Sequence, residues 1–265
     1  MIAADFDLML VVPAFLAGAL VLSTHVPLGQ EVLKRGIIFI DIAIAQIAAL
    51  GVIAATVFGG ELHCWQIQLF AGLSALAGAA FIHWLEKKHG AILEALIGLL
   101  FVLAASGGLL LASYAPNSDE LLHDLLVGQI LWVNWDQLLW VAALYVPILF
   151  IWFNTKTKRH PVLFYLLFSL TVTASVQLVG IYLVFASLIL PALATRKLSN
   201  NTVGLGVAYI IGIFGYMTGL FASVLFDFPT GAITVWTLML CGLIVNQLIS
   251  RKFVAKWQLY FKFKG

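Results

Sequence analysis

The chain has 265 residues, of which 63% are hydrophobic and only 10% are charged, and its mean hydropathy is +1.06. Because a soluble domain carries about 25% charged residues, this composition excludes an ordinary soluble protein and predicts a chain that lies in a membrane. The net charge of +2 gives no reason to expect a nucleic acid partner. The two cysteines form no CxxC pair, so no disulfide framework is expected.

Long apolar runs occupy most of the sequence. A helix that spans a bilayer needs about 20 apolar residues. Runs of suitable length predict spans near 7–24, 37–58, 66–85, 91–113, 136–153, 203–226 and 231–249. Since these runs are distributed along the whole chain, we expect residues 1–265 to form a single all-α, polytopic transmembrane domain.

The stretch 162–194 differs from the other apolar runs. It has 33 residues, which is too long for one crossing, and basic residues flank it on both sides. A single crossing would place one of these basic clusters on the wrong side of the membrane. The stretch is therefore expected to enter and return, breaking near Gln177–Gly180, either as two short spans or as a re-entrant pair. Two spans would bring the total to nine, and about eight to nine helices are predicted.

All 14 Lys and Arg residues belong to five clusters, which alternate with stretches that contain none. The clusters are Lys34-Arg35, Lys87-Lys88, Lys156-Lys158-Arg159, Arg196-Lys197, and Arg251-Lys252-Lys256-Lys262-Lys264. Positively charged loops stay in the cytoplasm. With these spans, all five clusters fall on one side, so we expect a multi-pass protein of the cell (inner) membrane whose C-terminus is cytoplasmic.

Motifs for enzymatic chemistry are absent from the sequence. It contains no GxxxxGK[ST] phosphate loop, no GxSxG and no HExxH. There is also no long soluble segment that could hold a catalytic site. We therefore expect a transport protein rather than an enzyme, with no cofactor of its own.

A few polar side chains lie inside the predicted spans, where they are costly and usually face a pathway or a partner. Asp41 and Gln46 are in the second span, five residues apart, so in a regular helix their directions differ by about 140°. Asp41 is either a pathway residue or a carboxylate near the membrane interface. Glu94 is as well explained by its place at a helix start as by a ligand role.

The predicted outer loops carry two weaker signals. Residues 114–135 contain Asp119, Glu120, His123 and Asp124 and are either a short amphipathic helix on the outer face or a solvated loop. Glu61, His63 and Cys64 are metal-ligand types in another loop. Three such residues in one loop are only a weak indication of metal handling.

Five segments, in order along the chain, resemble the membrane subunit of zinc/manganese ABC importers. They are VPLGQEVLKRGIIFIDIAIAQIAALG (26–51), ILEALIGLLFVLAAS (92–106), DLLVGQILWVNWDQL (124–138), LVGIYLVFASLILPALATRKL (178–198) and LFDFPTGAITV (225–235). The fourth carries Val-Gly, a branched apolar run, Pro-Ala and a basic residue, in the family's order.

The resemblance implies a permease subunit of an ATP-driven importer for a divalent transition metal, zinc first, with manganese or iron as the alternatives. Two copies would form the pathway, a cytoplasmic ABC ATPase would drive it, and an extracytoplasmic metal-binding protein would dock on the outer surface. Pro191–Ser199 would be the segment that couples to the ATPase. The resemblance assigns this coupling role to Pro191, Ala192, Thr195, Arg196 and Lys197.

One departure from the family pattern concerns the metal site. Members of this family carry Asp-x-x-x-His in the second span, whereas here Asp41 is followed four residues later by Ala45. If Gln46 takes the His position, the aspartate is one residue early. Gln offers a carbonyl oxygen, a poorer match to zinc than an imidazole nitrogen. Asp41 and Gln46 are the residues that the resemblance assigns to the translocation pathway.

Two other functions fit a polytopic chain. A secondary transporter would work without an ATPase and often has unwound helices at the midplane, and the break near Gln177 would suit it. No matching break occurs in the first half of the sequence. A membrane scaffold without transport is less consistent with polar residues inside the spans.

Overall fold

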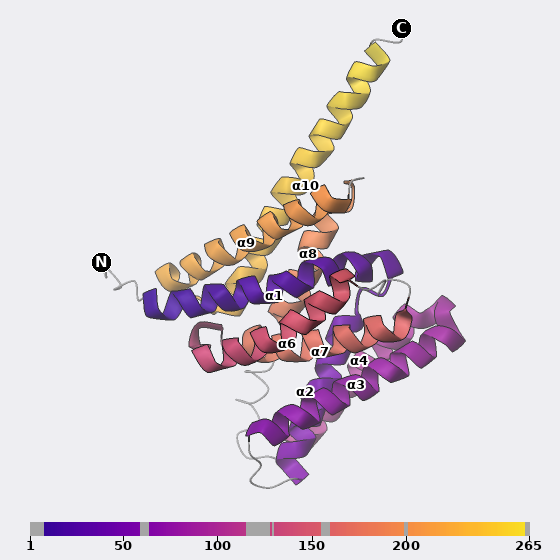
Figure 1. Ribbon diagram of the computed structural model, residues 1–265, viewed down its shortest axis with the longest axis vertical. Helices are drawn as coiled ribbons and strands as arrows, with labels where there is room; N and C mark the ends of the chain where they lie inside the picture. The colour runs from indigo at the N-terminus through magenta and orange to yellow at the C-terminus, as the bar shows by residue number, and fades with distance from the viewer. Residues whose placement is uncertain are drawn as a thin grey trace.

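The computed structural model describes residues 8–58, 64–114, 128, 130–154, 160–198 and 201–262. In these ranges the chain is helical and contains no strand (Figure 1). The α-helices are α1 (Leu8–Arg35), α2 (Ile40–Phe58), α3 (Cys64–His89), α4 (Leu93–Ala112), α6 (Trp135–Asn154), α7 (Pro161–Val179), α8 (Ile181–Thr195), α9 (Asn201–Phe226) and α10 (Thr230–Lys262), with 3-10 turns η1 (Gly90–Ile92) and η2 (Ile130–Trp132). The predicted all-α fold is confirmed.

Seven helical stretches of the described chain are long and apolar enough to cross a membrane. One of them, Trp65–Ala112, contains both α3 and α4, and the apolar helix α8 is shorter than the rest. Large apolar side chains are exposed on the outside, among them Leu110, Trp140 and Phe150, as expected for surfaces that meet lipid. The polytopic architecture is thus confirmed, while the number of eight to nine crossings stays a prediction.

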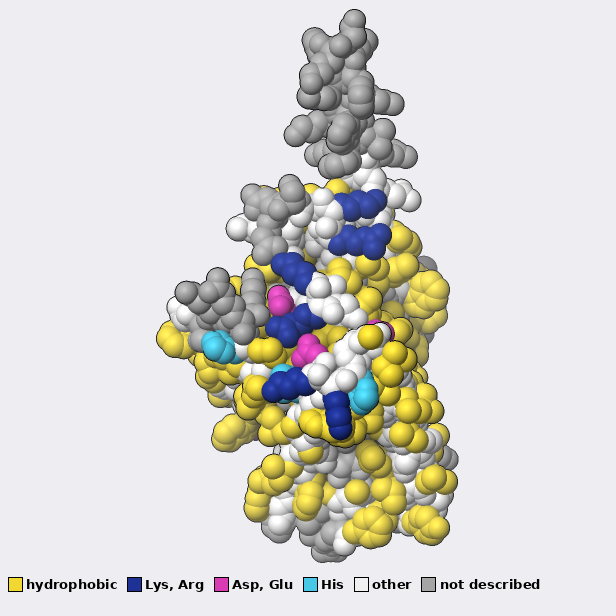
Figure 2. All heavy atoms as spheres, turned by 90° about the vertical axis from the view of Figure 1, so that its right-hand side faces the viewer, with side chains coloured by type: hydrophobic (Ala, Val, Ile, Leu, Met, Phe, Trp, Pro, Cys, Tyr) yellow, Lys and Arg dark blue, Asp and Glu magenta, His cyan; other side chains and the backbone are white. Residues whose placement is uncertain are grey.

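The described basic side chains gather at one end of the helices. Lys34 and Arg35 lie in the last turn of α1, Lys87 and Lys88 in the last turn of α3, and the Arg196-Lys197 pair directly after α8. Figure 2 shows Lys and Arg side chains together on a single face of the molecule. This placement is the one the charge pattern predicts for these three clusters. The clusters at 156–159 and in the tail lie outside the described side chains.

Helices α2, α3 and α4 form one packing group. A Cβ on Gly78 of α3 would meet Ile47, and a Cβ on Gly108 of α4 would meet Ile53. At the start of α4, Glu94 accepts a hydrogen bond from the backbone N–H of Phe39, just before α2. The chain therefore runs along α2, returns along α3 and, after the turn at η1, runs beside α2 again.

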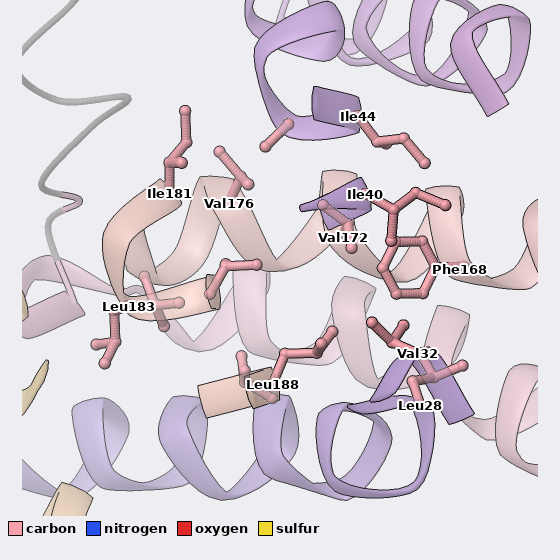
Figure 3. Packing of buried hydrophobic residues seen from close by; sticks show 14 of the residues in the cluster. Leu28, Val32, Ile40, Ile44, Phe168, Val172, Val176, Ile181, Leu183 and Leu188 are labelled. Carbon is pink, nitrogen blue, oxygen red and sulfur yellow. The ribbon is translucent and has the colours of Figure 1, made fainter. Parts of the chain in front are cut away.

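Helix α7 lies at the centre of the core. Phe168, Val172 and Val176 of α7 are buried with Ile40 and Ile44 of α2. Figure 3 shows these side chains facing one another, and shows α8 returning beneath α7 toward α1. Most of α7 is buried because it packs against α1, α2, α3, α6 and α8. The central position explains why small hydroxyl side chains of α7, such as Thr171 and Ser175, are buried together with its apolar ones.

The predicted break in 162–194 is confirmed, and it lies at Gly180. This residue has φ 79° and ψ 163°, a backbone conformation that residues with a side chain rarely adopt. Its N–H bonds to the Val176 carbonyl and its carbonyl accepts from Val184, so the buried backbone is paired across the break. Gly128 packs directly on this backbone, where a Cβ would overlap Val179. Since α7 begins and α8 ends toward the basic end, the chain enters and returns as expected.

The first helix is longer than the sequence indicates. The apolar run predicts a span at 7–24, but α1 continues through Pro27 to Arg35. A proline inside a helix leaves the carbonyl four residues earlier without its usual donor. That carbonyl is Ser23, and the Tyr209 hydroxyl of α9 donates to it at 2.9 Å. A tertiary contact thus replaces the lost bond, and the helix does not end.

The longer α1 also changes the place of His25. The predicted span 7–24 would leave His25 just beyond its end, but in the structure His25 lies well inside α1 and is fully buried. Its Nδ1 donates to the Val21 carbonyl at 2.9 Å. His25 is therefore a core residue of α1 rather than an interfacial one.

Candidate functional site

Helix α8 has a different surface at each end. Near its N-terminus it borders an open apolar groove, and at its C-terminus it borders a basic pocket. The sequence assigns candidate residues to both places, namely Asp41 and Gln46 to a pathway and Pro191–Lys197 to a coupling segment. The structure separates these candidates into accessible and buried ones.

The groove has a volume of about 560 Å³ and lies between α2, α4, α8 and α10. Helix α8 contributes more of its lining than any of the other three helices. The polar side chains among the described lining residues are Gln46 of α2, Tyr182 of α8 and Trp236 of α10. All the others are aliphatic, phenylalanine or methionine, and include Ile42 and Phe185. The groove is thus an apolar surface with a few neutral polar groups.

Asp41 and Gln46 are not brought together. Gln46 lines the groove, whereas Asp41 is 0% exposed and is not among the groove-lining residues that the structure describes. Both carboxylate oxygens of Asp41 are buried without a hydrogen-bond partner among the described residues. Glu94 is near enough to interact with Asp41 electrostatically. Asp41 therefore faces the protein interior instead of the groove, and it lies close to the carboxylate of Glu94.

The register of α2 explains the separation. Residues four apart share a face of a helix, whereas residues five apart do not. Ile42 is four residues before Gln46 and lines the groove with it. Asp41 is one residue early and points to the interior, while Ala45, four residues after it, is also buried. The face of α2 that meets the groove therefore carries an isoleucine where the family pattern has an aspartate.

The groove does not provide the donors that a transition metal ion prefers. Zinc in proteins is held by thiolates, imidazoles and carboxylates. No group of three or more His, Cys, Asp or Glu side chains that could hold a metal ion occurs in the described part of the chain. The residues Glu61 and His63 lie outside the described residues, and so does the side chain of Cys64, so the loop cluster they form stays a prediction.

Glu94 has a structural role. It lies in the first turn of α4, and its Oε1 accepts the Phe39 N–H at 3.2 Å. A carboxylate at a helix start offsets the positive end of the helix dipole. Glu94 thus links the starts of α2 and α4, in line with the interpretation that it begins a helix.

The coupling candidates lie at the other end of α8. Pro191, Ala192 and Thr195 are buried, and the Thr195 hydroxyl donates to the Pro191 carbonyl at 2.9 Å within the helix. Arg196 and Lys197 are exposed in the turn that follows, and Lys197 Nζ donates to Ser250 Oγ of α10 at 3.0 Å. Only the last two of these five side chains can make broad contact with another protein.

Arg196 borders a pocket of about 420 Å³ at the basic end. The pocket lies between the end of α1, the end of α8 and the start of α9, and Lys34 lines it from α1. It therefore offers two positive side chains around a cavity. Lys34 was recognised from the sequence only as a charge that sets orientation, because nothing in the sequence indicates that the ends of α1 and α8 meet.

The aromatic groove residues Tyr182, Phe185 and Trp236 were also missed. The helical period would have found Ile42, since it lies one turn before Gln46. No comparable pattern points to the three aromatic residues, because apolar side chains at this spacing are equally typical of lipid-facing helices. Tyr182 is 53% and Trp236 67% exposed, so both are available to a molecule in the groove.

Comparison with known proteins agrees with this architecture. The chain is 27% identical over 225 residues to the manganese transport system membrane protein MntC of Halalkalibacterium halodurans, covering 77% of this chain and 75% of that protein. It is 23% identical over 241 residues to the high-affinity zinc uptake system membrane protein ZnuB of Haemophilus influenzae, covering 83% and 90%.

A solved structure shares the fold. A chain of PsaBC from Streptococcus pneumoniae in complex with Fab superposes with a TM-score of 0.72 at 23% identity, covering 90% of this chain and 91% of that one. The model of the ABC 3 transport family matches residues 7–159 and 153–249. The matches run over nearly the whole chain, which belongs to the ABC 3 transport family and is a membrane transport subunit rather than an enzyme.

Proposed function

We propose that this chain is the permease subunit of an ATP-driven importer of a divalent transition metal. The observation that carries the proposal is the family match over almost the whole length, together with a helix arrangement that has one basic end. The named relatives are manganese and zinc systems. Zinc, manganese and iron are accordingly the metals to test.

The basic end is proposed to face the cytoplasm, which places the C-terminus there and the chain in the cell membrane. Positively charged segments are retained on the cytoplasmic side, and the ends of α1, α3 and α8 carry such segments. The opposite end would then receive an extracytoplasmic metal-binding protein. Residues 115–127, which belong to the predicted outer loop, lie outside the described residues.

A separate ATPase is proposed to dock on the turn after α8. Arg196 and Lys197 are the exposed side chains of this turn, and Arg196 borders the basic pocket with Lys34. Pro191, Ala192 and Thr195 would act from inside the helix, by fixing the direction in which the turn leaves α8. A movement of this turn would be carried along α8 to Tyr182 and Phe185 in the groove, as in a rigid-body transition.

Two copies of the permease are proposed to form the complete pathway. Helix α10 buries a small share of its apolar stretch within one chain, and Trp236, Leu240 and Ile244 are exposed on it. Large exposed apolar surfaces in a membrane protein meet lipid or another subunit. A second copy could therefore pack beside the groove.

Uptake of radiolabelled zinc, manganese and iron into vesicles tests the proposal. The vesicles would hold this chain with and without its ATPase and ATP. ATP-dependent uptake of any one metal is the expected result. Uptake that needs no ATPase would contradict the proposal and favour a secondary transporter, and uptake of none of the three would contradict both.

The assignment of Asp41 to the pathway is tested in the same vesicles. We expect Asp41→Asn to lower metal uptake more than it lowers the amount of folded protein, if its carboxylate meets the metal on the way. Equal losses of uptake and of folded protein would show that Asp41 acts only in the packing of α2 against α4. Gln46→Asn, on the face of α2 that lines the groove, is the variant to compare with Asp41→Asn.

A further inference from the structure

We propose that the basic pocket at the end of α8 binds the phosphate headgroup of an anionic membrane phospholipid. Such a site goes beyond the proposed function, because it takes a lipid of the surrounding bilayer and neither the metal nor the ATPase. Three features of the pocket support this assignment, namely its charge, its place at the edge of the apolar surface, and the space beside Gly204.

The charge of the pocket favours an anion. The end of α1, the end of α8 and the start of α9 meet there, and Lys34 and Arg196 both line the cavity of about 420 Å³. Gln30 adds an amide, and no carboxylate is among the described lining residues. The one carboxylate of α1, Glu31, forms an ion pair with Arg35 at 3.1 Å. Two positive side chains around one cavity attract a negative ligand, and the guanidinium of an arginine suits the oxygen atoms of a phosphate in particular.

The place of the pocket favours an anion that carries apolar chains. The pocket belongs to the face on which the basic side chains gather (Figure 2). Its two basic side chains lie in the last turn of α1 and directly after α8, where the apolar helices end. Leu33 and Leu198 line the same cavity and are partly exposed, and Val203 at the start of α9 is 51% exposed. A phospholipid combines these two chemistries, and basic pockets between spanning helices are typical headgroup sites.

Gly204 of α9 keeps part of the cavity open. A Cβ on this residue would have Gln30, Leu198 and Thr195 as its nearest neighbours, at 3.8–4.0 Å. All three line the pocket, so a side chain at position 204 would extend into it. The volume of about 420 Å³ falls within the roughly 300–1,000 Å³ of typical small-molecule sites, which is enough for a headgroup.

A lipid uses more of the pocket than other anions do. A free phosphate ion would meet the two charges but would leave Leu33 and Leu198 in contact with water. An acidic segment of a partner protein would meet the exposed turn at Arg196 without filling a cavity between three helices. A headgroup with its acyl chains matches the charge, the cavity and the apolar edge together.

Native mass spectrometry of the delipidated permease tests the inference. The probes are dioleoyl phosphatidylglycerol, which is anionic, and dioleoyl phosphatidylcholine, which has no net charge. We expect the anionic lipid to bind at least about fourfold more tightly, since it gains two exposed ion pairs. Lys34→Gln and Arg196→Gln should each weaken its binding roughly two- to fivefold, as for loss of one such pair. Lys88→Gln, at the end of α3 and outside the pocket lining, is the control for net charge.

Filling the cavity gives a second test that leaves the charges in place. Gly204→Leu should weaken binding of phosphatidylglycerol by about tenfold or more, because the new side chain extends into the pocket. Gly206→Leu is the matched control on the same helix, since nothing lies within 4 Å of a Cβ there, and it should bind the lipid like the unaltered chain. Both changes raise helix propensity, and thermal unfolding in detergent checks that both variants are folded.

Several results would overturn the inference. Equal binding of the two lipids by the unaltered chain would do so, as would undiminished binding of phosphatidylglycerol by a folded Gly204→Leu variant. Displacement of the lipid by excess inorganic phosphate at constant ionic strength would assign the pocket to a free phosphate ion. Loss of ATPase binding in Gly204→Leu, with phosphatidylglycerol binding unchanged, would assign the pocket to the ATPase. ATP-dependent uptake judges the proposed function separately.

Discussion

The two ends of α8 differ in chemistry although one short helix carries both. Its N-terminal half presents Tyr182 and Phe185 to an apolar groove, and its C-terminal end presents Arg196 to a basic pocket. Between them the helix is buried against α1, α9 and α10. If the proposed function holds, the basic end of α8 would contact the ATPase while the opposite end lies at the groove, and one short helix would connect the two.

The break at Gly180 makes this arrangement possible. Because α7 and α8 enter and return toward the same basic end, α8 reaches only part of the way through the bundle. Its start can therefore lie at the groove inside the membrane while its end reaches the aqueous side. A continuous helix over 162–194 could not place both of its ends in this way.

The largest effect is expected where α1 supports α8. A Cβ on Gly29 would overlap the carbonyl oxygen of Leu188 in the middle of α8. The backbone of α8 cannot yield as a flexible side chain can, so Gly29→Ala should destabilise the protein by about 1–3 kcal/mol and impair groove and basic pocket together. Thermal unfolding in detergent measures the change. Gly206→Ala, at a site with no atom within 4 Å of the new Cβ, should be neutral.

The next effect separates the two ends. Arg196→Glu reverses the charge at the basic pocket, far from the groove lining. ATP-dependent uptake should fall by at least about tenfold, as for a disrupted charged docking contact, while the thermal stability of the permease stays unchanged. Lys88→Glu is the control at the same end of the molecule but on α3. Equal loss in both variants would mean that overall charge, rather than the turn after α8, recruits the ATPase.

A smaller effect is expected at the groove end. Gln46→Leu removes the amide while keeping a similar volume. Loss of one hydrogen-bonding group should lower ATP-dependent metal uptake by roughly two- to tenfold, with ATPase recruitment unaffected. Gln177→Leu serves as the control because Gln177 is exposed near the break and is not among the groove residues. If both variants take up metal equally well, Gln46 does not contact the cargo.

The smallest effect concerns the support of α1. Tyr209→Phe removes the hydroxyl that donates to the Ser23 carbonyl, which Pro27 leaves without its helical partner. Loss of this one part-buried hydrogen bond should lower the free energy of unfolding by about 0.5–1.5 kcal/mol. Thermal unfolding in detergent checks this. The exposed Tyr114 provides a neutral control as Tyr114→Phe.

Much of the fold could be predicted from charge and hydropathy. Basic clusters on both sides of 162–194 were enough to predict the return at Gly180, since the charge rule and the length limit leave few alternatives. The end of α1 could not be predicted in this way. Pro27 is typical of a helix end, and the donor that keeps the helix intact, Tyr209, is 182 residues further along the chain.

The candidate site was only partly predictable. Gln46 and Arg196 were found because they match positions of a known family pattern, and both are accessible in the structure. The orientation of Asp41 depends on one residue of helical register, which boundaries predicted from a sequence do not fix. The groove combines side chains from four helices, and no local pattern reveals such a combination.

The most direct test of the connection through α8 is the width of the groove as the ATPase changes state. Spin labels at Leu99 of α4 and Leu240 of α10, with Cys64 and Cys241 replaced by serine, would report the distance across it. Double electron–electron resonance on the permease–ATPase complex should give different distance distributions with and without ATP, and Arg196→Glu should abolish the difference. An unchanged distribution in a preparation that still performs ATP-dependent uptake would contradict the account.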